Sequence, residues 1–242
     1  MTEPGRIGIL GGTFDPFHLG HLALARAART TLHLDEVRIV PSNVPPHRAA
    51  PGASSYHRFA MAALGIAEEP GLVLDDIEMA LDGPSFTTTT LARFHDKGFT
   101  PSQILFIVGA DAFAEIATWR DYPHVLDAAN FVVIARPGFT ASSLAERMPS
   151  LAARMSHVDG HPAHPAHLTH PAHVAILLLD LETPNVSGTR IRQRASSGAS
   201  LDGLVPPLVA AHIKAHHLYQ PSESRSASGR SAAHELHEQE SI

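Results

Sequence analysis

"RIGILGGTFDPFHLGH", residues Arg6–His21, joins a short apolar run to a glycine-rich turn and two histidines. The apolar run Arg6–Leu10 is typical of a buried strand. Gly11 and Gly12 come directly after it and allow the backbone to turn sharply, with amide groups open to an anion. Leu19–Thr31 has helical spacing, so the two histidines fall at a helix start, where unpaired amides and the helix dipole favour a negative group.

Outward from this stretch, short apolar runs alternate with longer segments of helical spacing. We expect strands at Arg6–Leu10, Glu36–Val40, Leu72–Ile77, Ile104–Val108, Asn130–Ala135 and Val174–Leu181. Helices are expected at Leu19–Thr31, Tyr56–Ala67, Phe86–His95 and Pro207–His217. This alternation builds βαβ units, so the sequence predicts an α/β fold with a doubly wound parallel sheet and helices on both faces.

The chain is predicted to form one domain over residues 1–220, followed by a polar tail at 221–242 that is expected to be disordered. A histidine- and proline-rich insertion at 157–173 interrupts the domain, and its histidines recur at every third position from His161 to His173. Prolines at this density favour polyproline II, which has three residues per turn. The insertion is interpreted as a flexible segment that grew by repetition, with weak zinc or nickel binding as the alternative.

Composition excludes several classes of function. The chain has 242 residues, 44% of them hydrophobic, so it is long enough to bury a full core. It has no cysteine, which rules out disulfides, iron–sulfur clusters and thiol catalysis. A net charge of −6 argues against a nucleic-acid partner. The chain shows neither a leader pattern nor an apolar run of roughly 20 residues, so a cytoplasmic protein without a membrane partner is expected.

Loops suited to binding phosphate follow five of the predicted strands. They are Gly11–Gly12, Pro41–Arg48, Gly109–Asp111, Arg136–Gly138 and Thr183–Arg192. In an open parallel sheet, ligands bind beyond the carboxyl ends of the strands, where the strand order reverses. The sequence therefore predicts a small phosphorylated ligand at this edge of the sheet.

The two histidines have other interpretations. Because they lie one helical turn apart, His18 and His21 could share a zinc ion, with Asp15 as the nearest third ligand. They could also be structural residues at the helix start, with Asp15 serving as a cap beside Pro16. Residue types alone leave these alternatives open.

The segment "GGTFDPFHLGH" resembles the GGTFDPxHxGH signature of the nucleotidyltransferases with an HxGH motif, in particular the bacterial nicotinate-nucleotide adenylyltransferases. The similarity runs from Gly8 to about Tyr219 and is interrupted by the insertion. It implies a Rossmann-like nucleotidyltransferase fold. It also implies a step of NAD biosynthesis in which the adenylyl group of ATP is transferred to nicotinate mononucleotide, giving nicotinate adenine dinucleotide and pyrophosphate.

For ATP, the resemblance implies that His18 and His21 contact the triphosphate and stabilise the charge that develops on the transferred group. The other ATP-binding residues that it implies are Gly11, Gly12, Thr13, Phe14, Arg48, Ser187, Thr189 and Arg192. Arg48 stands where the family has a lysine, so charge is kept but a planar fork replaces a point charge. Gly188 replaces the second serine of the family's ISSTxIR motif, which removes one hydroxyl contact. From residue type alone, this motif could equally be a helix cap with solvated arginines.

For the mononucleotide, the resemblance implies Thr87, Gly109, Asp111, Trp119 and Arg136. Thr87 is implied to help recognise the nicotinate carboxylate, Asp111 to bind ribose hydroxyls and Trp119 to stack on the pyridine ring. Residue type alone leaves a core position for Trp119 and a plain turn at Arg136 as alternatives.

The resemblance implies Mg²⁺ as the cofactor, bound mainly through ATP phosphates and water, because the sequence shows no cage of carboxylates. Two other functions remain open at this point. One is a histidine-rich metal-binding or storage protein on an α/β scaffold, and the other is a pantetheine-phosphate adenylyltransferase. The sequence leaves the oligomeric state open and allows a homo-oligomer.

Overall fold

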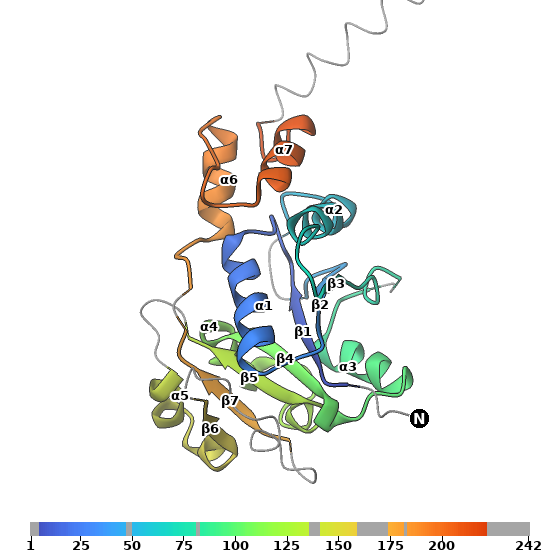
Figure 1. The fold of residues 1–242 in the computed structure, drawn as a ribbon, viewed down its shortest axis with the longest axis vertical. Coiled ribbons are helices and arrows are strands. Elements are labelled where there is room, and N and C mark those ends of the chain that lie inside the picture. The colour runs from blue at the N-terminus through green and yellow to red at the C-terminus, as the bar shows by residue number, and fades with distance from the viewer. Residues whose placement is uncertain are drawn as a thin grey trace, which may run out of the picture.

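The computed structural model describes residues 5–46, 50–80, 83–135, 141–158, 174–181 and 183–221. Its strands are β1 Ile7–Gly12, β2 Glu36–Pro41, β3 Leu72–Leu74, β4 Ile104–Gly109, β5 Asn130–Ile134, β6 Met155–His157 and β7 Ile176–Leu179. They form one sheet in the order β3-β2-β1-β4-β5-β7-β6, and every neighbouring pair is parallel (Figure 1). The predicted parallel α/β sheet is therefore confirmed.

The α-helices are α1 Leu19–Thr31, α2 Ser55–Gly65, α3 Thr87–Asp96, α4 Ala110–Phe113, α5 Ala141–Arg147, α6 Gly188–Ser196 and α7 Pro207–Ala215. Short 3₁₀ helices occupy Pro101–Gln103, Ile116–Thr118, His124–Asp127 and Pro149–Arg154. None of the helices in the described ranges combines the length and apolar character needed to cross a bilayer.

Helices cover both faces of the sheet because successive side chains of a strand point to opposite faces. In β4, Leu105 and Ile107 belong to one hydrophobic core, which also contains side chains of α1, α2, α6 and α7. Phe106 and Val108 belong to a second core with side chains of α3, α4 and α5. The continuous apolar runs of the central strands thus reflect burial on both faces.

The predicted strands and helices are all present, with ends shifted by a few residues. The predicted strand Leu72–Ile77 ends early at Leu74, because the Asp75 side chain accepts a hydrogen bond from the Ile77 amide at 3.0 Å and turns the chain out of the sheet. Strand β6 was not predicted from the sequence. It has only three residues and lies at the sheet edge. His157, taken as the start of the insertion, is therefore part of the sheet.

Most of two predicted segments lies outside the described residues. These parts are 159–173 of the histidine-rich insertion 157–173 and 222–242 of the polar tail 221–242.

The strand order reverses between β1 and β4. From β1 the chain proceeds outward through β2 to β3, and β4 then returns to the other side of β1 and leads outward to β5 and β7. In such sheets, the crevice beyond the carboxyl ends of the two strands at the reversal is where ligands bind. The loops that follow Gly12 and Gly109 lie at this point.

Candidate active site

Gly11 and Gly12, expected to follow the first strand as a turn, are instead the last two residues of β1 and pair with β2. The loop after them is shaped by Gly12 and by a buried aromatic ring. A Cβ atom at Gly12 would lie 2.8 Å from the ring of Phe14, so only glycine leaves room for that ring. Phe14 has a positive φ of 49° and is 2% exposed, and its ring packs edge-on against Phe17 and His21. Its side chain therefore belongs to the core, and any contact of Phe14 with a nucleotide would have to come from its backbone.

His18 and His21 lie together at the start of α1. His18 is the residue that caps the helix, and its Nδ1 accepts a hydrogen bond from the His21 amide at 3.4 Å. Nδ1 of His21 in turn accepts from the His18 amide at 3.2 Å. The two rings stack with centroids 3.6 Å apart. Gly20 leaves space for this arrangement, since a Cβ atom there would approach the His18 ring to 3.0 Å.

These hydrogen bonds set the chemistry of both rings. A neutral imidazole has one nitrogen that donates and one that accepts. Because Nδ1 accepts from a backbone amide in both His18 and His21, the proton of the neutral ring is on Nε2. Each ring then presents an N–H donor on the side away from the capping contacts. Paired donors at a helix start suit an anionic oxygen.

Asp15 connects the β1–α1 loop to distant parts of the chain. Its carboxylate accepts hydrogen bonds from the amides of Gly52 and Ala53 at 2.8 and 3.1 Å, and from the Tyr219 hydroxyl at 2.8 Å. Within the described part of the chain, no group of metal-ligating side chains contains Asp15, His18 or His21. Asp15, the third ligand that the zinc alternative named, instead caps amides far away in sequence.

Arg58 is a supporting residue that the sequence analysis missed. It is 1% exposed, and its guanidinium donates to the backbone oxygens of Thr13, Ser42 and Asn43 at 2.8, 2.6 and 2.8 Å. Burial lowers the pKa of Arg58, while the Asp15 charge opposes this shift. Arg58 thus fixes the loops that follow β1 and β2 to each other. In the sequence it looks like an ordinary helical arginine, because its acceptors are main-chain atoms of other segments.

The "VSGTRIR" segment forms the start of α6. Ser187 caps the helix and accepts from the Arg190 amide at 3.3 Å. Arg192 donates to the backbone oxygen of Asp15 at 2.7 Å and to the exposed Thr189 hydroxyl at 3.2 Å. A Cβ atom at Gly188 would lie 3.0 Å from that Asp15 oxygen, so glycine allows this close approach of the two segments. The structure therefore brings α6 against the loop that carries His18.

Three of the residues predicted for the mononucleotide, Gly109, Asp111 and Trp119, lie at the end of β4 or after it, across the strand reversal. Gly109 ends β4, and Asp111 is exposed on the short helix that follows. Trp119 is partly buried and packs edge-on against Phe106 and Phe131, with centroids 6.2 and 6.4 Å away. Trp119 thus combines a packing role with a partly exposed surface. Thr87 is the first residue of α3.

Two predicted binding residues, Arg48 and Arg136, lie outside the described residues.

The buried carboxylate of Glu78 lies against α3. Glu78 is 6% exposed and accepts a hydrogen bond from the Thr90 hydroxyl. Burial raises the pKa of Glu78, and the hydroxyls of Thr90 and Ser85 partly offset this shift. Since Thr90 and Thr87 share α3, Glu78 supports the helix that positions Thr87.

Comparisons with known proteins agree with this geometry. Residues 9–194 match the family described as cytidylyltransferase-like. The chain is 42% identical over 225 residues to a probable nicotinate-nucleotide adenylyltransferase of Aeromonas hydrophila, covering 92% of this chain and 100% of that one. It is 40% identical to the protein of the same name in Chromohalobacter salexigens, covering 90% and 97%.

Solved structures share the fold. Plasmodium falciparum nicotinic acid mononucleotide adenylyltransferase complexed with NaAD superposes with a TM-score of 0.64 at 17% identity, covering 89% of this chain and 98% of that chain. A putative nicotinate-nucleotide adenylyltransferase from Vibrio parahaemolyticus gives a TM-score of 0.55 at 18% identity, covering 90% and 98%.

Proposed function

The chain belongs to the cytidylyltransferase-like family and, within it, to the nicotinate-nucleotide adenylyltransferases, and from this premise we propose which of its residues carry out the reaction. The enzyme transfers the adenylyl group of ATP to nicotinate mononucleotide in NAD biosynthesis, forming nicotinate adenine dinucleotide and pyrophosphate. The observation that carries the residue assignment is the reciprocal capping of His18 and His21 beside the strand reversal.

The reaction needs alignment and charge stabilisation more than proton transfer. A phosphate oxygen of the mononucleotide, already ionised at neutral pH, attacks the α-phosphorus of ATP. The bond from that phosphorus to the bridging oxygen breaks, and pyrophosphate leaves with the electron pair. No general base is required, so catalysis rests on donors placed where negative charge develops. His18 and His21 supply such donors through Nε2 in this proposal.

Three further groups complete the proposed ATP site. The amides at Gly11, Gly12 and Thr13 approach the nucleotide from the end of β1. The start of α6 supplies Ser187 and Thr189. Arg192, whose contacts to Asp15 and Thr189 use two of its five N–H donors, directs the remaining donors toward phosphate. Arg48 adds a further positive charge in this proposal.

The mononucleotide is proposed to lie over the loop after β4. Asp111, exposed at the first turn of α4, accepts from ribose hydroxyls. Trp119 offers the exposed part of its ring to the pyridine, and Thr87 faces the carboxylate. Gly109 allows close approach of the backbone, and the positive charge of Arg136 is assigned to the mononucleotide from the resemblance.

We also propose Mg²⁺ as the ion that accompanies ATP. Within the described residues, the only group of side chains placed to hold a metal contains three histidines, which do not suit this hard cation. The Asp15 carboxylate is already occupied by two amides and a hydroxyl. An ion held by ATP phosphates and water fits these surroundings, and when bound it neutralises phosphate charge.

A pyrophosphate-release assay tests the proposal. The purified chain is given ATP, Mg²⁺ and one acceptor: nicotinate mononucleotide, nicotinamide mononucleotide or 4′-phosphopantetheine. We expect the highest kcat/KM with nicotinate mononucleotide and no product with 4′-phosphopantetheine. Equal rates with the acid and amide mononucleotides would contradict the assignment of Thr87 to the carboxylate.

A further inference from the structure

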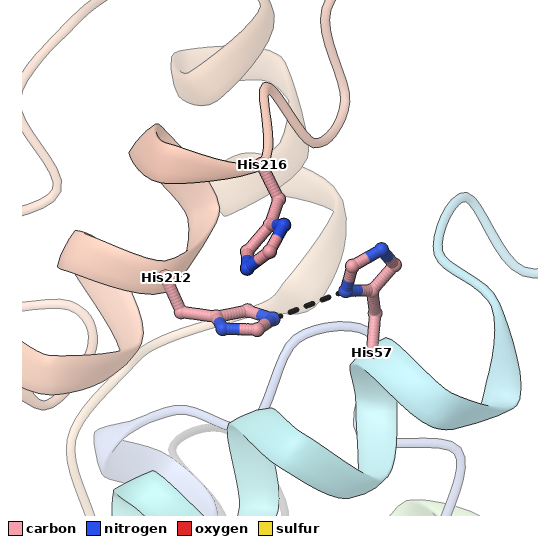
Figure 2. Close-up of side chains that lie close together, drawn as sticks. All are labelled: His57, His212 and His216. Atoms are coloured by element: carbon pink, nitrogen blue, oxygen red, sulfur yellow. Dashed lines mark hydrogen bonds between the residues drawn. The ribbon is translucent and has the colours of Figure 1, made fainter.

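Three histidines meet at the interface of α2 and α7. Figure 2 shows His57 of α2 facing His212 of α7 and His216, which directly follows the last residue of α7. Nδ1 of His57 lies 3.1 Å from Nε2 of His212. Each of the three residues has a ring nitrogen that lies within 4.8 Å of the others.

The fold creates this group from separate sequence segments. His212 and His216 are four residues apart, so their side chains lie on the same face of α7. α2 and α7 pack side by side at one end of the sheet (Figure 1). Met61 of α2 and Val209 and Ile213 of α7 belong to the same hydrophobic core and are at most 4% exposed. His57 is one turn before Met61 and is carried to the same interface.

Three imidazoles without a carboxylate have a definite metal preference. Neutral imidazole nitrogen binds Zn²⁺, Cu²⁺, Ni²⁺ and Co²⁺ well, whereas Mg²⁺ and Ca²⁺ require oxygen ligands. We propose that His57, His212 and His216 form a transition-metal site, with Zn²⁺ as the typical occupant and water as its fourth ligand. This site shares no residue with the proposed adenylyl-transfer site and does not depend on its assignment.

The distances fit such an ion after a small adjustment. Zn–N bonds of about 2.0–2.1 Å place the nitrogens of a tetrahedral site about 3.4 Å apart. The His57–His212 pair, at 3.1 Å, is already near this value. His216 is exposed at the end of its helix, so its ring can turn toward the pair. Because all the separations are within 4.8 Å, the widest has to close by at most about 1.4 Å.

The packing of the two helices brings the ligands together before any ion binds. α2 lies against α7, and a ring nitrogen of each of the three histidines lies within 4.8 Å of the others. A neutral imidazole has a lone pair for a metal ion, whereas the protonated ring has none. The cluster is therefore preorganised for metal.

Metal binding at this place would join α2 to α7. The two helices come from positions 155 residues apart in the chain. A ligand that binds only the folded chain stabilises it according to its concentration and affinity. At a metal concentration about 100 times the dissociation constant, we expect the melting temperature to rise by about 5–10 °C.

Metal titration of matched variants tests the site. The full-length chain, His212→Asn and His57→Asn are stripped of metal with a chelator and titrated with Zn²⁺ by calorimetry. His217→Asn is the control, because His217 is exposed, lies next to His216 and has a positive φ of 48° that asparagine tolerates. All chains keep the histidine-rich insertion, so its binding contributes equally to each titration.

We expect the parent chain and the control to bind one more equivalent than either test variant. The zinc-induced rise in melting temperature should be lost in both test variants and kept in the control. Co²⁺ should give the visible absorption of a four-coordinate site in the parent chain and in the control, and in neither test variant. Equal stoichiometry in all four chains, or an equal temperature shift, would overturn the proposal. If His212→Asn fails to fold, His57→Asn on the other helix decides the question by the same comparison.

Discussion

The stacked rings of His18 and His21 each accept a backbone hydrogen bond from the other residue, with the ring planes only 16° apart. One pair of side chains therefore both caps α1 and fixes its own tautomers. The structural role of these residues and their proposed chemical role use different ring atoms, Nδ1 and Nε2. The two roles can therefore be separated by substitution.

Replacing His18 by asparagine should separate its role as helix cap from its proposed role as a hydrogen-bond donor. Asparagine is a good helix cap, so His18→Asn should keep the melting temperature close to that of the parent. It lacks the Nε2 donor, so kcat should fall on the order of 10²-fold, as for loss of a donor to developing charge. His18→Ala should show the same loss of turnover together with a loss of stability of about 1 kcal/mol. Parent-like kcat for His18→Asn at saturating substrates would exclude the donor role.

The Tyr219–Asp15 hydrogen bond should stabilise the whole site. Tyr219 comes from the end of the described fold, and burial together with the Asp15 charge raises the pKa of its hydroxyl. Tyr219→Phe removes a hydrogen bond to a charged group, so the free energy of unfolding should fall by about 1.5 kcal/mol or more. Urea titration measures the change. Tyr56→Phe is the matched control, because Tyr56 is 81% exposed, and the prediction fails if both variants unfold at the same urea concentration.

Substitution of Trp119 should weaken the binding of nicotinate mononucleotide more than the binding of ATP. Trp119→Ala removes the ring surface proposed for the pyridine, so KM for nicotinate mononucleotide should rise at least about tenfold while KM for ATP changes little. The ring also packs on Phe106 and Phe131, so some loss of stability is expected in addition. Trp119→Phe keeps an aromatic surface and should recover most of the acceptor binding. A parallel rise in both KM values would assign Trp119 to packing alone.

Glu78 should make stability depend on pH in a predictable direction. Its folded-state pKa is raised above the unfolded value, mainly by burial. Its contribution to stability is therefore fully present below the unfolded pKa and is lost as pH rises through the folded pKa. Glu78→Gln cannot ionise, so the variant should gain stability over the parent as pH rises from about 5 to about 8. Glutamine at position 78 can still accept the hydrogen bond from the Thr90 hydroxyl.

Urea midpoints across this pH range measure the effect of Glu78. Glu115→Gln serves as the control, because Glu115 is exposed and its removal should leave the pH profile unchanged. If the profiles of Glu78→Gln and the parent run parallel, Glu78 does not contribute the pH dependence.

Local patterns predicted the framework well. The bounds expected for α1 agree with the structure residue by residue, because its apolar positions recur with helical spacing next to the His18 cap. The central strands were predicted because burial on both faces makes them continuously apolar. The edge strand β6 was missed, because three half-exposed residues have no such pattern.

The candidate site was predicted only in part. The motif spacing placed His18, Ser187 and Asp111 after strands, and the structure confirms those positions. Phe14 was assigned to the nucleotide from the motif, but its ring packs into the core. Arg58 and Tyr219 carried no signal, because their partners are backbone atoms and a carboxylate brought near only by folding.

By itself, the sequence determined the α/β alternation, the position of the histidine motif directly after the first strand and the family to which the chain belongs. These features depend on periodicity and on short motifs, which are properties of neighbouring residues. Only the tertiary structure decided that Asp15 contacts Gly52 and Tyr219, which lie 37 and 204 residues further along the chain. It also decided that His57 meets His212 and His216. Contacts of that kind depend on how helices pack on the sheet, and packing is settled by the burial of the whole core rather than by any local pattern.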